Sequence, residues 1–115
     1  MTFEEFTAKI QTQYDENNCP VTKVLDLLNG KWTTRVIYEL ERHQSIRFGE
    51  LKKAMPSITN AMLSSTLKML ETQGIVLRKQ YNEVPLRVEY SLSESGRAML
   101  NIYYEMAVWG AKYLQ

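Results

Sequence analysis

The stretch FGELKKAMPSIT at residues 48–59 decides the fold of this chain. A proline disfavours the α conformation of the residue before it, so the helix that begins at Phe48 is predicted to end at Met55. Thr59 is a preferred N-cap for a second helix, predicted from about Asn60 to Gln73, because its hydroxyl can accept from an orphan backbone N–H. Residues 48–73 therefore form a helix-turn-helix, a motif whose second helix can enter the DNA major groove.

Two strand patterns follow this motif. Residues 75–81 and 87–92 are predicted as strands, and apolar residues alternate with polar ones along the second. Asn82 begins the connecting loop, which ends at Pro85, since proline cannot donate to a strand ladder. A hairpin over residues 75–92, directly after the motif, is typical of a wing. The fold class is therefore mainly α (α+β), a winged helix-turn-helix with extra helices at both ends.

The outer helices carry more apolar residues than one small domain can cover. Residues 1–30 contain two short amphipathic patterns, and a further helix is predicted from Lys31 to Arg42. The last helix, from about Glu94 to Tyr113, is apolar around most of its circumference. Exposed apolar surface of this extent marks interfaces, which favours a homodimer formed through residues 1–30 and 94–115. The alternative is that both ends fold back on their own core.

Length and composition indicate one globular domain, residues 1–115. The net charge is only +1, but residues 31–97 carry eleven Lys or Arg against seven Glu. No apolar run is long enough for a membrane span, and the N-terminus lacks a signal-peptide pattern, so we expect a cytoplasmic protein without a membrane partner. The single cysteine excludes an internal disulfide and a cysteine zinc cluster. We expect no metal site and no cofactor.

Small polar residues and cations at the motif predict a DNA interface. Such side chains permit close approach to base edges and phosphates, and a wing needs cations to reach the backbone or the minor groove. The other interpretation is an ordinary solvated surface. The candidate DNA-binding residues are Lys31, Arg47, Thr59, Asn60, Ala61, Ser64, Ser65, Lys68, Lys79, Asn82 and Arg87.

Cys19 precedes Pro20 at a predicted helix start. The helix dipole and free N–H groups there favour a thiolate, which reacts with oxidants and electrophiles, so Cys19 is a candidate thiol sensor. A small apolar residue buried at an interface is the other interpretation. An enzyme is not expected, because no base or oxyanion site accompanies the thiol and His43 is a surface cation at a helix end.

The ordered motifs Cys19-Pro20-Val21, Gly30-Lys31-Trp32-Thr33 and Arg47-Phe48-Gly49-Glu50-Leu51 resemble bacterial regulators of the HxlR family. The resemblance continues at residues 58–63 (ITNAML), 67–71 (LKMLE) and 83–92 (EVPLRVEYSL) and at Gly96, and spans about residues 19–100.

The resemblance implies a winged helix-turn-helix homodimer that regulates transcription, with the terminal helices at the interface. We expect a sequence-specific regulator, in the simplest case a repressor, on double-stranded operator DNA with a pseudo-palindromic sequence. The resemblance also implies a response to quinones, aldehydes or oxidants in some members, through a cysteine at the place of Cys19. The effector is unknown, and the alternative function is a protein-interaction module that does not bind DNA.

Overall fold

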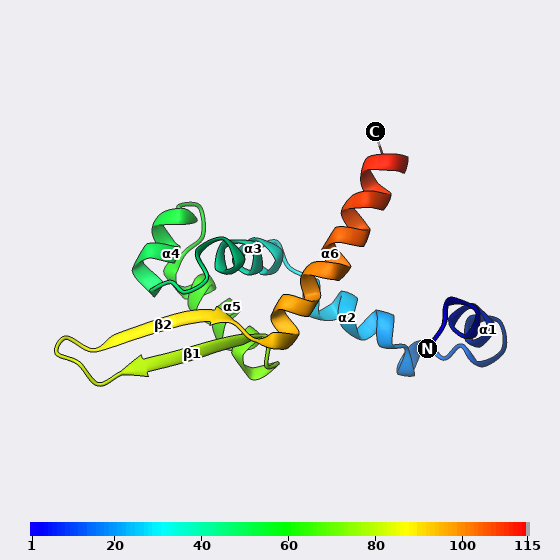
Figure 1. Ribbon diagram of the computed structural model, residues 1–115, viewed down its shortest axis with the longest axis horizontal. Helices are drawn as coiled ribbons and strands as arrows, with labels where there is room; N and C mark the ends of the chain where they lie inside the picture. The colour runs from blue at the N-terminus through cyan, green and yellow to red at the C-terminus, as the bar shows by residue number, and fades with distance from the viewer. Residues whose placement is uncertain (115) are drawn as a thin grey trace. The chain divides into compact units, whose positions relative to one another are not determined.

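The computed structural model describes residues 1–114 as two compact units, Met1–Gly30 and a second unit that begins at Lys31 (Figure 1). In the first unit, Thr2 caps the first helix by accepting from the Glu5 N–H at 3.0 Å. No side chain of its two α-helices is buried. The elements of this unit are α1 (Phe3–Gln13), the 3-10 helix η1 (Glu16–Asn18) and α2 (Pro20–Leu28).

The second unit is a winged helix-turn-helix, as the sequence predicted. Its elements are α3 (Thr33–His43), α4 (Phe48–Ala54), α5 (Asn60–Thr72), β1 (Val76–Tyr81), β2 (Arg87–Leu92) and α6 (Glu94–Tyr113). The apolar stripes that predicted the helices form the core, which includes Val36, Ile37, Leu40, Leu51, Leu63, Leu67 and Leu70. Met55 ends α4 before the proline, also as predicted, and α3 begins two residues later than expected.

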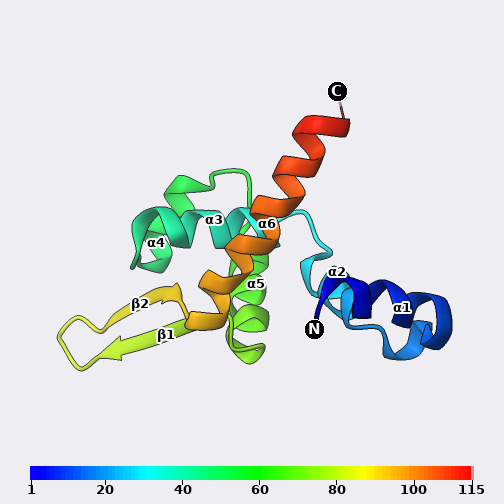
Figure 2. The ribbon, with the colours of Figure 1, turned by 45° about the vertical axis from the view of Figure 1, so that its right-hand side comes forward.

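The strands β1 and β2 form an antiparallel hairpin whose pairs run from Val76–Leu92 to Tyr81–Arg87. In both ribbon views the hairpin projects from the helices, with the loop at its far end (Figures 1 and 2). The short strand expected at residues 45–47 is reduced to one bridge. There the Ile46 N–H donates to the Tyr90 carbonyl at 3.0 Å and the Tyr90 N–H donates back at 2.8 Å.

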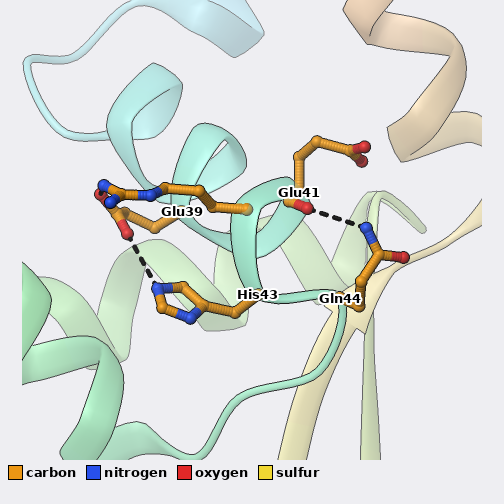
Figure 3. A network of polar contacts seen from close by, with 5 residues as sticks. Glu39, Glu41, His43 and Gln44 are labelled. Carbon is orange, nitrogen blue, oxygen red and sulfur yellow. Dashed lines mark hydrogen bonds and ion pairs between the residues drawn. The ribbon is translucent and has the colours of Figure 1, made fainter.

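The end of α3 turns sharply toward this bridge (Figure 3). Gln44 has a φ of 65°, an uncommon conformation for a residue with a side chain. The side-chain amide of Gln44 donates to the Glu41 backbone carbonyl at 3.0 Å, and this bond caps the helix end. His43 Nε2 lies 3.3 Å from a carboxylate oxygen of Glu39. The turn carries the chain directly from α3 to the base of the wing.

The first turn of α6 packs against the residues that directly follow α5 and hydrogen-bonds to them. Ser93 caps α6 by accepting from the Gly96 N–H at 3.1 Å. Gly74, with a φ of 77°, follows α5, and the Ser93 hydroxyl contacts its carbonyl. Gly96 packs so closely on the Ile75 carbonyl that a Cβ there would overlap it. The angle at which α6 leaves the domain is therefore set by backbone contact.

Beyond this first part, α6 is largely exposed. Its buried residues are Gly96, Met99 and Tyr103. The exposed apolar side chains of its remaining length are Ile102, Tyr104, Met106, Val108, Trp109 and Tyr113. These apolar side chains therefore have no cover within the second unit. Within residues 1–114, no helix is both long enough and apolar enough to span a membrane.

Candidate nucleic-acid interface

Helix α5 has one buried face and one exposed face. The buried face consists of Leu63, Thr66, Leu67 and Leu70. The Thr59 hydroxyl accepts from the Met62 N–H at 3.1 Å, which satisfies one free donor at the start of the helix. We call the exposed residues at and after this cap the α5 surface: Thr59, Asn60, Ala61, Met62, Ser64, Ser65 and Lys68.

Met62 is the member of the α5 surface that sequence reasoning missed. Its side chain is 45% exposed among small polar residues. The Ser65 hydroxyl donates to the Met62 carbonyl at 3.4 Å and lies 3.9 Å from its sulfur. The sequence could have indicated that Met62 is exposed, because it directly precedes Leu63 and so lies outside the buried leucine stripe of α5. An apolar side chain at this place can contact a thymine methyl group in a major groove.

The hairpin presents cations of two kinds. Lys79 and Asn82, both predicted, are exposed, and so is Arg78, which the sequence reasoning did not select. Lys79 Nζ lies 4.8 Å from the centre of the Tyr81 ring. Arg87, in contrast, is half-buried and paired with two carboxylates. Within residues 1–114, Lys68, Arg78 and Lys79 make no ion pair, so their charges are available to a ligand.

The remaining two predicted cations lie at helix starts. Arg47 is exposed at the N-cap position of α4, and its side chain makes no capping bond. Lys31 is exposed just before α3, with its Nζ 4.9 Å from the centre of the Trp32 ring. Thr34, in the first turn of α3, hydrogen-bonds Tyr103 of α6. Lys31 lies at the N-terminal end of α3, and the C-terminal end of α3 lies near the wing. The eleven residues of α3, a length of about 16 Å, separate Lys31 from the wing.

Cys19 is partly exposed in the first unit, at the N-cap position of α2. The Thr22 hydroxyl, and then the Thr22 backbone N–H, lower the pKa of the Cys19 thiol below its ordinary value, and partial desolvation opposes them. The thiol lines a cavity of about 360 Å³ within this unit, together with apolar side chains that include Phe6, Ile10 and Tyr14. The lining also includes Lys9 and Asp15, and a partly exposed thiol beside a cavity of mixed character is accessible to a small organic electrophile.

Comparison with known proteins gives the context of this geometry. The family model for HxlR-like helix-turn-helix proteins matches residues 27–115. The chain is 47% identical over 91 residues to the uncharacterised HTH-type transcriptional regulator YdzF of Bacillus subtilis, covering 79% of this chain and 84% of YdzF.

Two solved structures are similar over most of the chain. The reduced form of the transcriptional regulator YodB from B. subtilis has a TM-score of 0.77 and 32% identity, covering 85% of this chain and 96% of YodB. The redox regulator HypR in its oxidised form has a TM-score of 0.72 and 41% identity, covering 84% of this chain and 99% of HypR. The winged helix-turn-helix, the exposed α5 surface and these likenesses agree, and the chain belongs to the HxlR-like helix-turn-helix family of DNA-binding transcriptional regulators.

Proposed function

We propose that this regulator reads its operator with the α5 surface in the major groove and the wing against the flanking backbone. The observation that carries the proposal is the division of α5, whose leucines are buried while Asn60, Ser64, Ser65 and Lys68 are exposed together. Hydroxyl and amide groups read base edges, and cations bind phosphates. Arg47, Lys79 and Asn82 extend the contact to the backbone, and Lys31 contacts a phosphate farther away.

The active form is a homodimer. The apolar face of α6, from Ile102 to Tyr113, supports this proposal because it is exposed in the single chain. Residues 1–30 contribute a second part of the interface. A two-fold axis would place the two α5 helices in successive major grooves, about 34 Å apart, and would match a pseudo-palindromic operator. Such binding represses transcription in the simplest case.

The test is operator binding by the full chain. Bound sites are first selected from genomic DNA, and affinity is then measured by fluorescence anisotropy from low to high salt. Lys68→Ala is expected to weaken binding and to lower the salt slope by about 1.8 per dimer, because each of the two subunits loses one phosphate contact of about 0.9. The matched control is Arg42→Ala, a cation at the end of α3 whose side chain is 75% exposed and which lies outside the proposed DNA contacts and dimer interface. Equal affinity and slope for Lys68→Ala and wild type would contradict the proposed contact.

A response to thiol-reactive compounds is a second part of the proposed function. The lowered pKa of the Cys19 thiol and the adjoining cavity support it. The likeness to HypR, which is named a redox regulator, also supports it. With a single cysteine in the chain, the chemistry is either modification of Cys19 or a Cys19–Cys19 disulfide between two copies.

Diamide and a quinone test this response. Either compound is expected to change operator affinity for wild type and to leave Cys19→Ser unaffected. Non-reducing electrophoresis distinguishes the two chemistries, because only the disulfide doubles the apparent mass. An equal change in both proteins would show that Cys19 is not the sensor.

We further infer that the protein works in the cytoplasm, where operator DNA is accessible, and that it is not an enzyme. The support is the match of the chain to a family and to relatives that are transcriptional regulators. Peroxide or quinone turnover by wild type that is lost in Cys19→Ser would contradict this inference.

A further inference from the structure

Arg87 differs from the other cations of the hairpin because partners surround it. Its Nε lies 2.8 Å from Glu83 Oε2 and 3.9 Å from Glu89 Oε1. Its guanidinium carbon lies 3.8 Å from the centre of the Tyr81 ring. The Arg87 side chain is only 30% exposed. A cation with two carboxylates and an aromatic face around it has little charge left for a phosphate.

The strand register explains how these groups meet. Tyr81 pairs with Arg87, and Lys79 pairs with Glu89, as successive pairs on one face of the hairpin. Glu83 belongs to the loop and reaches back to the same face, and its N–H donates to the Tyr81 carbonyl at 2.9 Å. Arg87 therefore connects the loop to the last pair of the strands.

The nature of the contacts favours arginine at this position. The planar guanidinium can lie against the Tyr81 ring and face carboxylates at its edge, which a lysine ammonium cannot do in the same way. The Nε lacks an aligned hydrogen bond, so the pair with Glu83 depends on charge and proximity. Contacts of this kind are individually weak, and together they can bias the orientation of a loop without determining the fold.

Glu89 extends the same cluster to the body of the domain. Its Oε2 accepts from the Ser45 hydroxyl at 3.1 Å. Ser45 directly precedes Ile46, which bridges to Tyr90 through two backbone hydrogen bonds. A continuous set of contacts thus runs from the end of α3 through Glu89 and Arg87 to Glu83 in the loop.

We infer that Arg87 is a positioning residue that holds the wing loop, residues 82–86, in the orientation that presents Lys79 and Asn82 to DNA. It acts through Tyr81, Glu83 and Glu89 and not through a phosphate contact of its own. The sequence predicts Arg87 as a DNA contact, and the carboxylates and the ring around it support this different role. The inference rests on the proposed contact between wing and operator.

The salt dependence of operator binding separates the two roles. Removal of a residue that neutralises a phosphate lowers the salt slope by about 0.9 for each subunit, about 1.8 for the dimer, and removal of a residue that positions others does not. Arg87→Ala is expected to weaken binding roughly threefold to tenfold with a nearly unchanged slope. Lys79→Ala, the matched control on the same face, is expected to lower the slope. Arg87→Lys keeps the charge without the planar group and is expected to bind as weakly as Arg87→Ala.

The mobility of the loop gives an independent readout in the free protein. The {1H}-15N NOE of the Asn82 and Glu83 amides is expected to fall in Arg87→Ala and in Glu83→Gln and to stay unchanged in Lys79→Ala. A lowered salt slope in Arg87→Ala, full binding by Arg87→Lys, or an unchanged NOE in Arg87→Ala would each overturn the inference. If Lys79→Ala leaves the slope unchanged, the proposed wing contact fails, and the NOE alone still decides the role of Arg87.

Discussion

Helices α5 and α6 both carry many apolar residues but use them differently. Three leucines and Thr66 of α5 are buried, and the exposed residues are mostly small and polar. In α6, only Gly96, Met99 and Tyr103 are buried, and Trp109 is 56% exposed. The apolar stripe of α5 thus belongs to the core of its own chain. Most of the apolar surface of α6 is available to a second chain.

The buried residues of α5 and the exposed residues of α6 should therefore contribute to different properties, the stability of the single chain and the stability of a complex. A core side chain stabilises the single chain, because its removal leaves a cavity among fixed neighbours. An exposed apolar side chain stabilises only the complex that covers it. Substitutions in the two helices should therefore affect different measurements.

The largest effect is expected from Leu63→Ala in α5. Leu63 is fully buried, and truncation of a buried leucine lowers the free energy of unfolding by about 2–5 kcal/mol. Urea unfolding followed by circular dichroism measures this change. The control is Ser64→Ala, an exposed neighbour, which should change stability little. Similar midpoints for the two variants would show that α5 does not contribute to the core as described.

The next effect concerns α6. Trp109→Glu introduces a charge into the exposed apolar face, and we expect the dimer dissociation constant to rise by a factor of at least about 30, as for a central interface residue. Analytical ultracentrifugation measures the constant, and the helical circular dichroism of the monomer should persist. Glu105→Gln, also exposed on α6, is the control. A monomeric wild type would refute the proposed dimer.

A smaller effect is expected at the cap of α5. Thr59→Ala removes the acceptor of the Met62 N–H and should lower the free energy of unfolding by about 1 kcal/mol. Thr59→Ser retains the hydroxyl and should remain close to wild type. Equal losses in both variants would mean that the Thr59 methyl group, and not the cap, matters.

The smallest effect is expected where α6 still belongs to the core. The Tyr103 hydroxyl accepts from the Thr34 hydroxyl at 3.1 Å, and Tyr103→Phe should lower the free energy of unfolding by about 0.5–1.5 kcal/mol at neutral pH. Thermal unfolding measures this loss. Tyr104→Phe, on the exposed side of the helix, is the control and should be neutral.

The same tyrosine predicts an alkaline effect. Burial raises the pKa of Tyr103, with a smaller contribution from Tyr38 and an opposing one from Thr34. Below about pH 10 both the folded and the unfolded chain keep the proton. Above it the unfolded chain releases the proton first, so stability falls as pH rises toward the folded pKa. Tyr103→Phe should therefore lose less stability than wild type between neutral and alkaline pH.

Local signals in the sequence were sufficient for the elements of the second unit. Pro56, Thr59 and Gly74 mark where helices end or begin, because their backbone and side-chain preferences act within a few residues. The α5 surface followed from the same helical periodicity, apart from Met62. The helix-turn-helix pattern predicted DNA binding, and the family resemblance added the expectation of transcriptional regulation, which agrees with the observed family match.

The sequence by itself determined where helices, turn and hairpin lie, because capping, periodicity and turn chemistry are local. Only the tertiary structure decided which charges are free and which apolar faces remain uncovered. The three cations at Arg78, Lys79 and Arg87 look alike along the chain. Cross-strand register places Arg87 opposite Tyr81. Glu89, two residues on along the same strand, and Glu83 in the loop both pair with Arg87, while Arg78 and Lys79 make no ion pair among the described residues. Charge partners depend on distances between strands and loops, and those distances exist only in the folded chain.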